Sequence, residues 1–127
     1  MKKIVLLLTL LTSSVFGEIS WMKYKDAIAQ AKAEKKIVMV MLSREGCQTC
    51  EYMKDIVFEN EKVMAAFEKN FLGVYIDIHD DYIPNDLRYM GTPTFHFLNG
   101  FERKLDRIDG GVNSLEFIEK LKEVQTK

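Results

Sequence analysis

The feature that most constrains the fold is an uninterrupted apolar run at residues 37–42, with the sequence IVMVML. Charged residues precede this run, and Gly46 follows it shortly afterwards. Such a run is typical of a strand buried on both faces, because alternation with polar residues is needed only where one face meets water. The run therefore predicts a central strand in a sheet that is covered on both sides.

Helical and strand patterns alternate around this run. Residues 24–36 are rich in Ala, Lys and Glu and predict an exposed amphipathic helix. Residues 47–57 predict a second helix, and Asn60 is placed to cap a third that continues to residue 69. Residues 71–78 predict another strand. Residues 84–89 predict a short helix, since a proline stands at its start.

The pattern changes to a hairpin after Pro93. Residues 94–98 predict a strand and residues 103–108 its antiparallel partner. Asn99 and Gly100, which lie between them, predict a type I′ turn, because both residue types tolerate positive φ.

The last helix is predicted from Asn113 to about residue 124, because Glu116 follows Asn113 at the spacing of a capping box. With a short strand around Ile19, the predicted order is β-α-β-α-β-α-β-β-α. Strands that alternate with helices and then end in a hairpin predict an α/β fold. We expect a mixed central sheet of about four to five strands, flanked by about four helices.

The N-terminus has the pattern of a secretory signal. Lys2 and Lys3 precede an apolar run at residues 4–11, and small residues lead to Gly17. The alternative, an uncleaved anchor, would need roughly 20 apolar residues to span a bilayer. We therefore predict a cleaved signal peptide at residues 1–17 and one domain at 18–127, located in the periplasm of a bacterium.

The charge of the predicted domain excludes one class of partner. Removing residues 1–17 takes away two lysines and no acidic residue, so the remaining domain is mildly acidic. Nucleic-acid binding requires a basic face. We therefore expect no nucleic-acid partner.

The two cysteines of the chain, Cys47 and Cys50, allow three interpretations. A structural disulfide that closes about four residues gains only about 1.9 kcal/mol in the chain-entropy model, against about 3 kcal/mol for a fifteen-residue loop. A zinc site would need His79 and His96 as further ligands, but sixteen residues lie between them, unlike a zinc-finger spacing. These histidines are expected to be structural or surface residues.

A redox pair is the third interpretation. Cys47 is expected at a helix N-terminus, where the helix dipole and unpaired backbone N–H groups favour a thiolate. Cys50 would lie on the same helical face, where it can attack a mixed disulfide formed at Cys47. Arg44 would favour the Cys47 thiolate, whereas Glu45 and Glu51 would oppose it.

These motifs together resemble the thioredoxin superfamily. Cys47-Gln48-Thr49-Cys50 follows a buried strand, and the sequence MGTPTFHFLNG comes later, so the resemblance covers essentially all of 18–127. It implies the thioredoxin fold, with Cys47 as the nucleophile and Cys50 as the resolving cysteine.

The resemblance also implies a substrate site around the cysteines. Pro93 matches the family's cis-proline, which faces the disulfide, and Thr92 would offer its backbone to an extended substrate. Gly46, Gln48 and Thr49 flank the cysteines and are expected to contact substrate too.

Two departures from the family pattern concern the redox chemistry. Cytosolic thioredoxins carry Trp-Cys-Gly-Pro-Cys, whereas Gln48 and Thr49 separate the cysteines here and match neither strongly reducing nor strongly oxidising members. Thioredoxins also bury an acid six residues before the first cysteine, and that position is Met41. The Cys-x-x-Cys-x-x-Met pattern from Cys47 to Met53, followed by the segment 57–63, is similar to exported members of the superfamily.

The resulting hypothesis is an exported thiol–disulfide oxidoreductase that reduces disulfides of other periplasmic proteins. Its substrates would be exported proteins with cysteines, and a membrane carrier would supply electrons. The Cys47–Cys50 disulfide would be its redox group, with no other cofactor and no metal, and the protein would be a monomer. Two alternatives remain: a periplasmic dithiol oxidase or isomerase, and a non-catalytic thioredoxin-like binding module.

Overall fold

A four-stranded mixed sheet forms the centre of the computed structural model, which describes residues 19–127. The strands are β1 (Ile37–Ser43), β2 (Phe71–Asp77), β3 (Thr94–Leu98) and β4 (Lys104–Asp109), in the spatial order β2-β1-β3-β4. β1 pairs with β2 in parallel, whereas the β1–β3 and β3–β4 pairs are antiparallel. The predicted α/β fold with a mixed sheet is confirmed. The predicted signal peptide lies outside the described residues.

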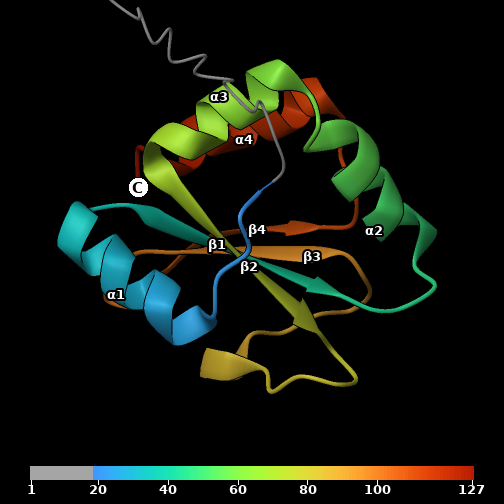
Figure 1. The fold of residues 1–127 in the computed structure, drawn as a ribbon, viewed down its shortest axis with the longest axis horizontal. Coiled ribbons are helices and arrows are strands. Elements are labelled where there is room, and N and C mark those ends of the chain that lie inside the picture. The colour runs from blue at the N-terminus through green and yellow to red at the C-terminus, as the bar shows by residue number, and fades with distance from the viewer. Residues whose placement is uncertain (1–18) are drawn as a thin grey trace, which may run out of the picture.

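Helices cover both faces of this sheet, as Figure 1 shows. They are α1 (Tyr24–Glu34), α2 (Gln48–Tyr52), α3 (Glu61–Asn70) and α4 (Ser114–Val124). A π-helical turn, η1 (Met53–Val57), continues α2, and a 3₁₀ turn, η2 (Pro84–Asp86), stands at the predicted short helix. α2, α3 and α4 lie on one side of the sheet, and α1 lies on the other (Figure 1).

The central strand β1 contributes to two separate cores. Met39 and Met41 point to the side of α2, α3 and α4, and they share a hydrophobic cluster with Cys47 and Cys50. The alternate residues Val38, Val40 and Leu42 point to the other side and pack with α1. All five of these β1 side chains are fully buried. The apolar run is therefore buried on both faces, as predicted.

Two helices begin at the asparagines that the sequence indicated. The Asn60 side chain accepts hydrogen bonds from two backbone N–H groups at the start of α3. The Asn113 side chain accepts one from the Glu116 N–H, at 2.9 Å. Glu116 Oε1 accepts a hydrogen bond from the Asn113 side-chain amide at 3.3 Å. In a full capping box it would instead accept one from the Asn113 backbone N–H. Each asparagine cap contributes about 1 kcal/mol.

Two other elements differ from expectation. The expected strand near Ile19 is a single bridge between Trp21 and Gly73. The helix expected at residues 47–57 widens into the π-helical turn, where the Phe58 N–H donates to the Met53 carbonyl at 2.8 Å. This wider turn buries both Met53 and Val57 completely.

The predicted type I′ turn between β3 and β4 is wrong. The Glu102 N–H donates to the Asn99 carbonyl at 3.0 Å, and the Asn99 N–H donates to the Arg103 carbonyl at 3.0 Å, which makes a three-residue loop. Positive φ falls on Glu102, at 62°, and not on Gly100. The loop is therefore an ordinary turn followed by one left-handed residue, the next most common hairpin connection.

Gly100 is required for a different reason, because the loop packs against α1. A Cβ atom at Gly100 would overlap the backbone N and Cα of Lys32. Backbone cannot move aside as a side-chain tip can, so we expect Gly100→Ala to lower the free energy of unfolding by about 2 kcal/mol. Urea unfolding measures this loss.

The matched control for this prediction is Gly91→Ala. Gly91 has no atom within 4 Å of an added Cβ, and its φ is not positive. We expect it to change the unfolding free energy by less than about 0.5 kcal/mol. Equal losses in the two variants would contradict the packing argument.

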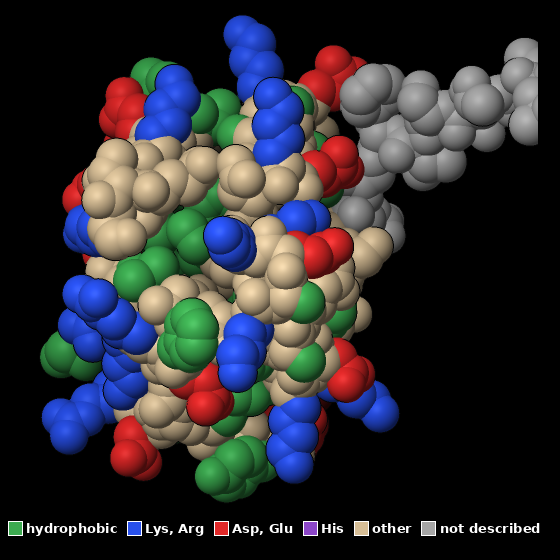
Figure 2. Space-filling model, turned by 90° about the vertical axis from the view of Figure 1, so that its left-hand side faces the viewer, with side chains coloured by type: hydrophobic (Ala, Val, Ile, Leu, Met, Phe, Trp, Pro, Cys, Tyr) green, Lys and Arg blue, Asp and Glu red, His purple; other side chains and the backbone are tan. Residues whose placement is uncertain are grey.

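Charged side chains of both signs share the face of the molecule opposite the start of α2, and apolar side chains lie between them (Figure 2). Within residues 19–127, no helix is long and apolar enough to cross a bilayer.

Candidate redox site

Cys47 and Cys50 form a disulfide at the end of β1, where the chain turns into α2. Gly46 makes this turn with a φ of +75°, a conformation that favours glycine. Cys47 is the N-cap of α2, and Cys50 lies in the first turn of that helix. Their Cα atoms are 5.2 Å apart. Cys47 is 4% exposed and Cys50 is fully buried, so only Cys47 reaches the surface.

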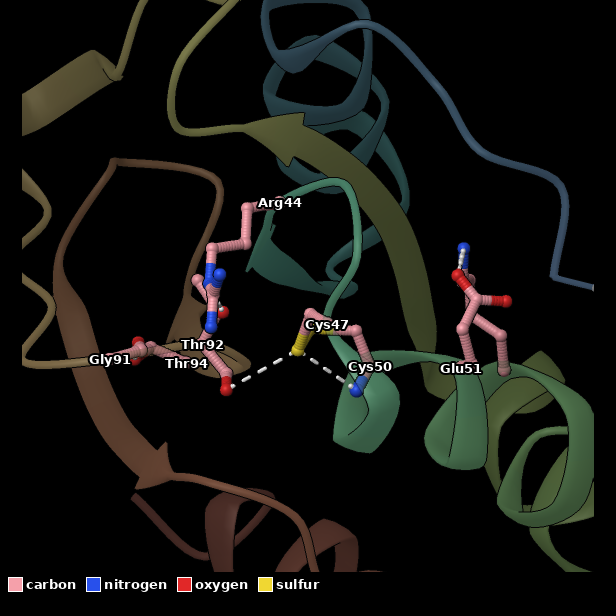
Figure 3. The surroundings of a disulfide bond; sticks show 8 residues. Arg44, Cys47, Cys50, Glu51, Gly91, Thr92 and Thr94 are labelled. Carbon is pink, nitrogen blue, oxygen red and sulfur yellow. Dashed lines mark hydrogen bonds and ion pairs between the residues drawn. A yellow bond between two sulfur atoms is a disulfide. The ribbon is translucent and has the colours of Figure 1, made fainter.

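Cys47 Sγ has two polar neighbours, which Figure 3 shows. The Cys50 backbone N–H donates a hydrogen bond to this sulfur at 3.2 Å. On the other side, the sulfur lies 3.5 Å from the Thr92 carbonyl oxygen. An N–H donor stabilises a thiolate more than a thiol. In the dithiol form, a Cys47 thiol in this position could donate to the Thr92 carbonyl.

The loop opposite the disulfide is held by its own hydrogen bonds. The Thr92–Pro93 peptide bond is cis. Thr94 Oγ1 donates to the Gly91 carbonyl at 2.7 Å. The Gly110 N–H donates to the Pro93 carbonyl at 2.8 Å. Across residues 19–127, no hydrogen bond uses the Thr92 N–H. The backbone of Thr92 is therefore fixed in place and still has a free donor.

Arg44 joins the two loops of the site through a hydrogen bond, in addition to the charge expected from the sequence. Its Nε donates to Thr92 Oγ1 at 3.0 Å, so the guanidinium lies beside the loop that faces Cys47 (Figure 3). No sequence pattern indicates this contact, because the two residues are 48 positions apart.

The acidic neighbour Glu51 is directed elsewhere. Its carboxylate pairs with Lys54 at 3.1 Å, on the side of the helix away from Thr92 (Figure 3). The positive charge of Lys54 offsets the negative charge of Glu51, whereas the Arg44 guanidinium lies beside Thr92. Arg44 therefore favours a Cys47 thiolate on reduction, and Lys54 weakens the opposing effect of Glu51.

The two residues between the cysteines have different surroundings. Thr49 packs its methyl group against Gly111 in the loop after β4, where an added Cβ would lie 2.5 Å from that methyl carbon. Gln48 is exposed. Of the five expected substrate contacts, Gly46, Thr92 and Pro93 lie on the two loops that border the disulfide, and Gln48 and Thr49 lie in the first turn of α2. Gly111, which the Thr49 methyl group meets, lies beside them, and no sequence motif indicates this contact.

The zinc interpretation of the cysteines finds no support in the described part of the chain. His96 lies on β3 between Phe95 and Phe97, which share the core of the cysteines, so its side chain points to the opposite face. His79 lies in the turn after β2, where its backbone N–H donates to Asp77. Residues 19–127 contain no group of three or more His, Cys, Asp or Glu that could hold a metal ion.

His96 instead fastens the segment that leads to Thr92. Its Nε2 lies 2.7 Å from the Arg88 carbonyl oxygen. Burial lowers the pKa of His96, and Arg107 and Lys104 add to this effect, while the Arg88 carbonyl and Asp109 work against it. The folded protein therefore favours the neutral imidazole, which can donate to that carbonyl through Nε2.

This pKa predicts a pH dependence of stability. An unfolded histidine titrates near pH 6.5. Since the folded pKa is lower, the contribution of His96 is fully present above about pH 6.5 and is lost as the pH falls toward the folded pKa. We expect wild type to lose more unfolding free energy than His96→Gln between about pH 7.5 and 5, in parallel urea titrations. Equal losses would show that His96 does not carry this dependence.

Comparisons with known proteins agree with this geometry. A family model described as thioredoxin-like matches residues 20–100. A thioredoxin from Thermus thermophilus is 30% identical, with a TM-score of 0.75, covering 87% of this chain and 90% of that one. A putative disulphide-isomerase from Bacteroides thetaiotaomicron is 22% identical, with a TM-score of 0.71 and coverages of 85% and 93%. The DsbH oxidoreductase is 17% identical, with a TM-score of 0.69 and coverages of 87% and 86%.

The family model spans well over half of the chain, and the structure holds a disulfide between the two cysteines of the motif. The predicted family and fold are thereby confirmed. The chain belongs to the thioredoxin-like family and is a thiol–disulfide oxidoreductase with a Cys47–Cys50 disulfide.

Proposed function

We propose that this protein is exported to the periplasm and reduces disulfides of other exported proteins, with Cys47 as the nucleophile. One observation carries the assignment of roles: Cys47 Sγ reaches the surface beside the Thr92 carbonyl, whereas Cys50 is fully buried behind it. A substrate disulfide can therefore approach Cys47 first.

The reaction proceeds by two exchanges. The Cys47 thiolate attacks one sulfur of the substrate disulfide, which forms a mixed disulfide and releases the other substrate sulfur as a thiolate that takes up a proton. Cys50 then loses its proton and attacks Cys47 Sγ. The Cys47–Cys50 bond forms, the bond between Cys47 and substrate breaks, and the leaving sulfur is protonated. The substrate gains two electrons and two protons.

The two loops provide places for an extended substrate. The free Thr92 N–H and the adjacent carbonyl can pair with a substrate backbone as a strand edge does. Met90, next to this loop, is 99% exposed, and Tyr52 on α2 is 41% exposed, so both can contact apolar side chains. Arg44 holds the Thr92 side chain, which keeps that edge in position.

Reduction outside the cytoplasm needs a supply of electrons. We propose a dithiol partner in the membrane that reduces the Cys47–Cys50 disulfide by the same exchange in reverse. The expected signal peptide and the Gln48-Thr49 pair, unlike that of cytosolic thioredoxins, support an exported role.

The first test is the redox equilibrium of the purified protein in glutathione buffers, read as the fraction of Cys47–Cys50 disulfide. A potential near the thioredoxin value of about −270 mV supports a reductase. A potential near about −120 mV would instead assign an oxidase that donates its disulfide. If no disulfide formed at any ratio of glutathione to its disulfide, the redox role would be lost and a binding module would take its place.

Export is tested separately by expressing the full chain in a bacterium and fractionating the cells. We expect the protein in the periplasmic fraction, with a mass that lacks residues 1–17. A full-length product retained in the cytoplasm would overturn the location and leave the redox assignment intact.

A further inference from the structure

The second exchange places a demand on Cys50 that its surroundings make difficult. Cys50 must lose a proton before it attacks, yet it is fully buried in an apolar cluster. Burial without a polar partner disfavours the thiolate. Met41, where thioredoxins bury an acid, is also fully buried and offers no hydrogen bond.

Few polar side chains are available to help it. The buried polar side chains among residues 19–127 are those of Ser43, Thr94 and His96. Thr94 and His96 alternate with Phe95 and Phe97 on β3, so both point away from the face that carries the cysteines. Both also have partners of their own, the Gly91 and Arg88 carbonyls.

Ser43 differs from the other two in both respects. It is the last residue of β1, and it follows Met39 and Met41 at a spacing of two, so its side chain is on the face that they share with Cys50. Its main chain is fixed, since its carbonyl accepts from the Ile78 N–H at 2.9 Å. Its hydroxyl is fully buried and has no hydrogen-bond partner.

A buried hydroxyl without a partner destabilises a fold, so its presence calls for an explanation. The disulfide form offers none, because a disulfide sulfur is uncharged and a poor acceptor. Reduction changes this, since a Cys50 thiolate is a charged acceptor on the same face of the sheet.

We propose that Ser43 is the positioning residue of the resolving cysteine. When the Cys47–Cys50 bond is open, its hydroxyl donates a hydrogen bond to Cys50 Sγ, directly or through one buried water. The bond stabilises the Cys50 thiolate that attacks the mixed disulfide. Serine is not a base, so Cys50 loses its proton to solvent before the attack, and the leaving substrate sulfur takes up a proton from solvent afterwards. This inference rests on the proposed function for its biological meaning.

The test compares Ser43→Thr with Ser43→Val. The two new side chains have the same shape, but threonine keeps a hydroxyl where valine has a second methyl group. Both are made with Cys47→Ala, which leaves Cys50 as the single thiol, and thiolate absorbance near 240 nm is followed against pH. We expect Ser43→Thr to leave the pKa of Cys50 as it is in the Cys47→Ala protein that retains Ser43. Ser43→Val should raise it by about one unit, a roughly tenfold loss of thiolate at neutral pH.

Two controls separate this role from a structural one. Met41→Leu, on the same face without a polar group, should leave the Cys50 pKa unchanged. Ser43→Val combined with Cys50→Ala should leave the pKa of Cys47 unchanged. Both β-branched residues suit a strand, and far-UV circular dichroism checks that each variant is folded.

The second readout is the rate at which Cys50 releases a small thiol from a mixed disulfide at Cys47, after a pH jump. With Ser43→Val this rate should fall about tenfold near pH 7, and the gap should close above the raised pKa. Equal Cys50 pKa values in the Thr and Val variants would overturn the proposal. Because that titration uses no substrate, it stands even if the protein fails to reduce any protein disulfide.

Discussion

Replacing Cys47 with serine is expected to abolish disulfide reductase activity, with a loss on the order of a thousandfold or more in an insulin reduction assay. A serine hydroxyl is not ionised at neutral pH, so the N–H donor from Cys50 and the nearby Arg44 have no thiolate to stabilise. The first exchange cannot begin, and no mixed disulfide should form with a model peptide disulfide.

Cys50→Ala is the matched variant, since it leaves the nucleophile in place. It should form the mixed disulfide at a rate near that of wild type and then fail to resolve it. Mass spectrometry should find a stable adduct at Cys47 in Cys50→Ala and none in Cys47→Ser. The reverse result, an adduct only at Cys50, would exchange the roles of the two cysteines.

The largest loss of stability is expected from Phe95→Ala. Phe95 is fully buried on β3, in the core that also holds the disulfide. Its ring makes edge-on contacts with Phe58, at a centroid distance of 5.9 Å, and with Phe117, also at 5.9 Å. Removing it leaves a cavity between three elements, which costs about 3–5 kcal/mol. Domains of this size have about 5–15 kcal/mol in all, so this loss would remove a large fraction of the total stability.

Phe101→Ala is the control for this prediction. Phe101 is 77% exposed in the hairpin loop, and the ammonium of Lys32 lies over its ring, 5.4 Å from the ring centroid. Its loss should cost less than about 1 kcal/mol. Chemical unfolding of the oxidised forms of both variants measures the difference. A cost for Phe95→Ala no larger than that for Phe101→Ala would mean that this aromatic core does not hold the sheet to its helices.

The elements that could be predicted from sequence are those whose signals are local. The apolar run of β1 is buried on both faces, and the Asn60 and Asn113 caps begin their helices, because each depends on neighbours within a few residues. The turn at Gly100 was mispredicted for the opposite reason. A glycine is needed at this position because the loop packs against the backbone of Lys32 on α1, which is far away in the chain. The local Asn-Gly pattern contains no information about such a contact.

The candidate site divides in the same way. The two cysteines, the strand that leads to them and the threonine–proline pair could all be predicted, since each has a local motif in the sequence. The three-dimensional structure was needed to show that Arg44 donates to Thr92 and that the Ser43 hydroxyl is buried without a partner. These facts depend on which side chains the sheet brings together, because pairing between strands joins residues that no spacing along the chain relates.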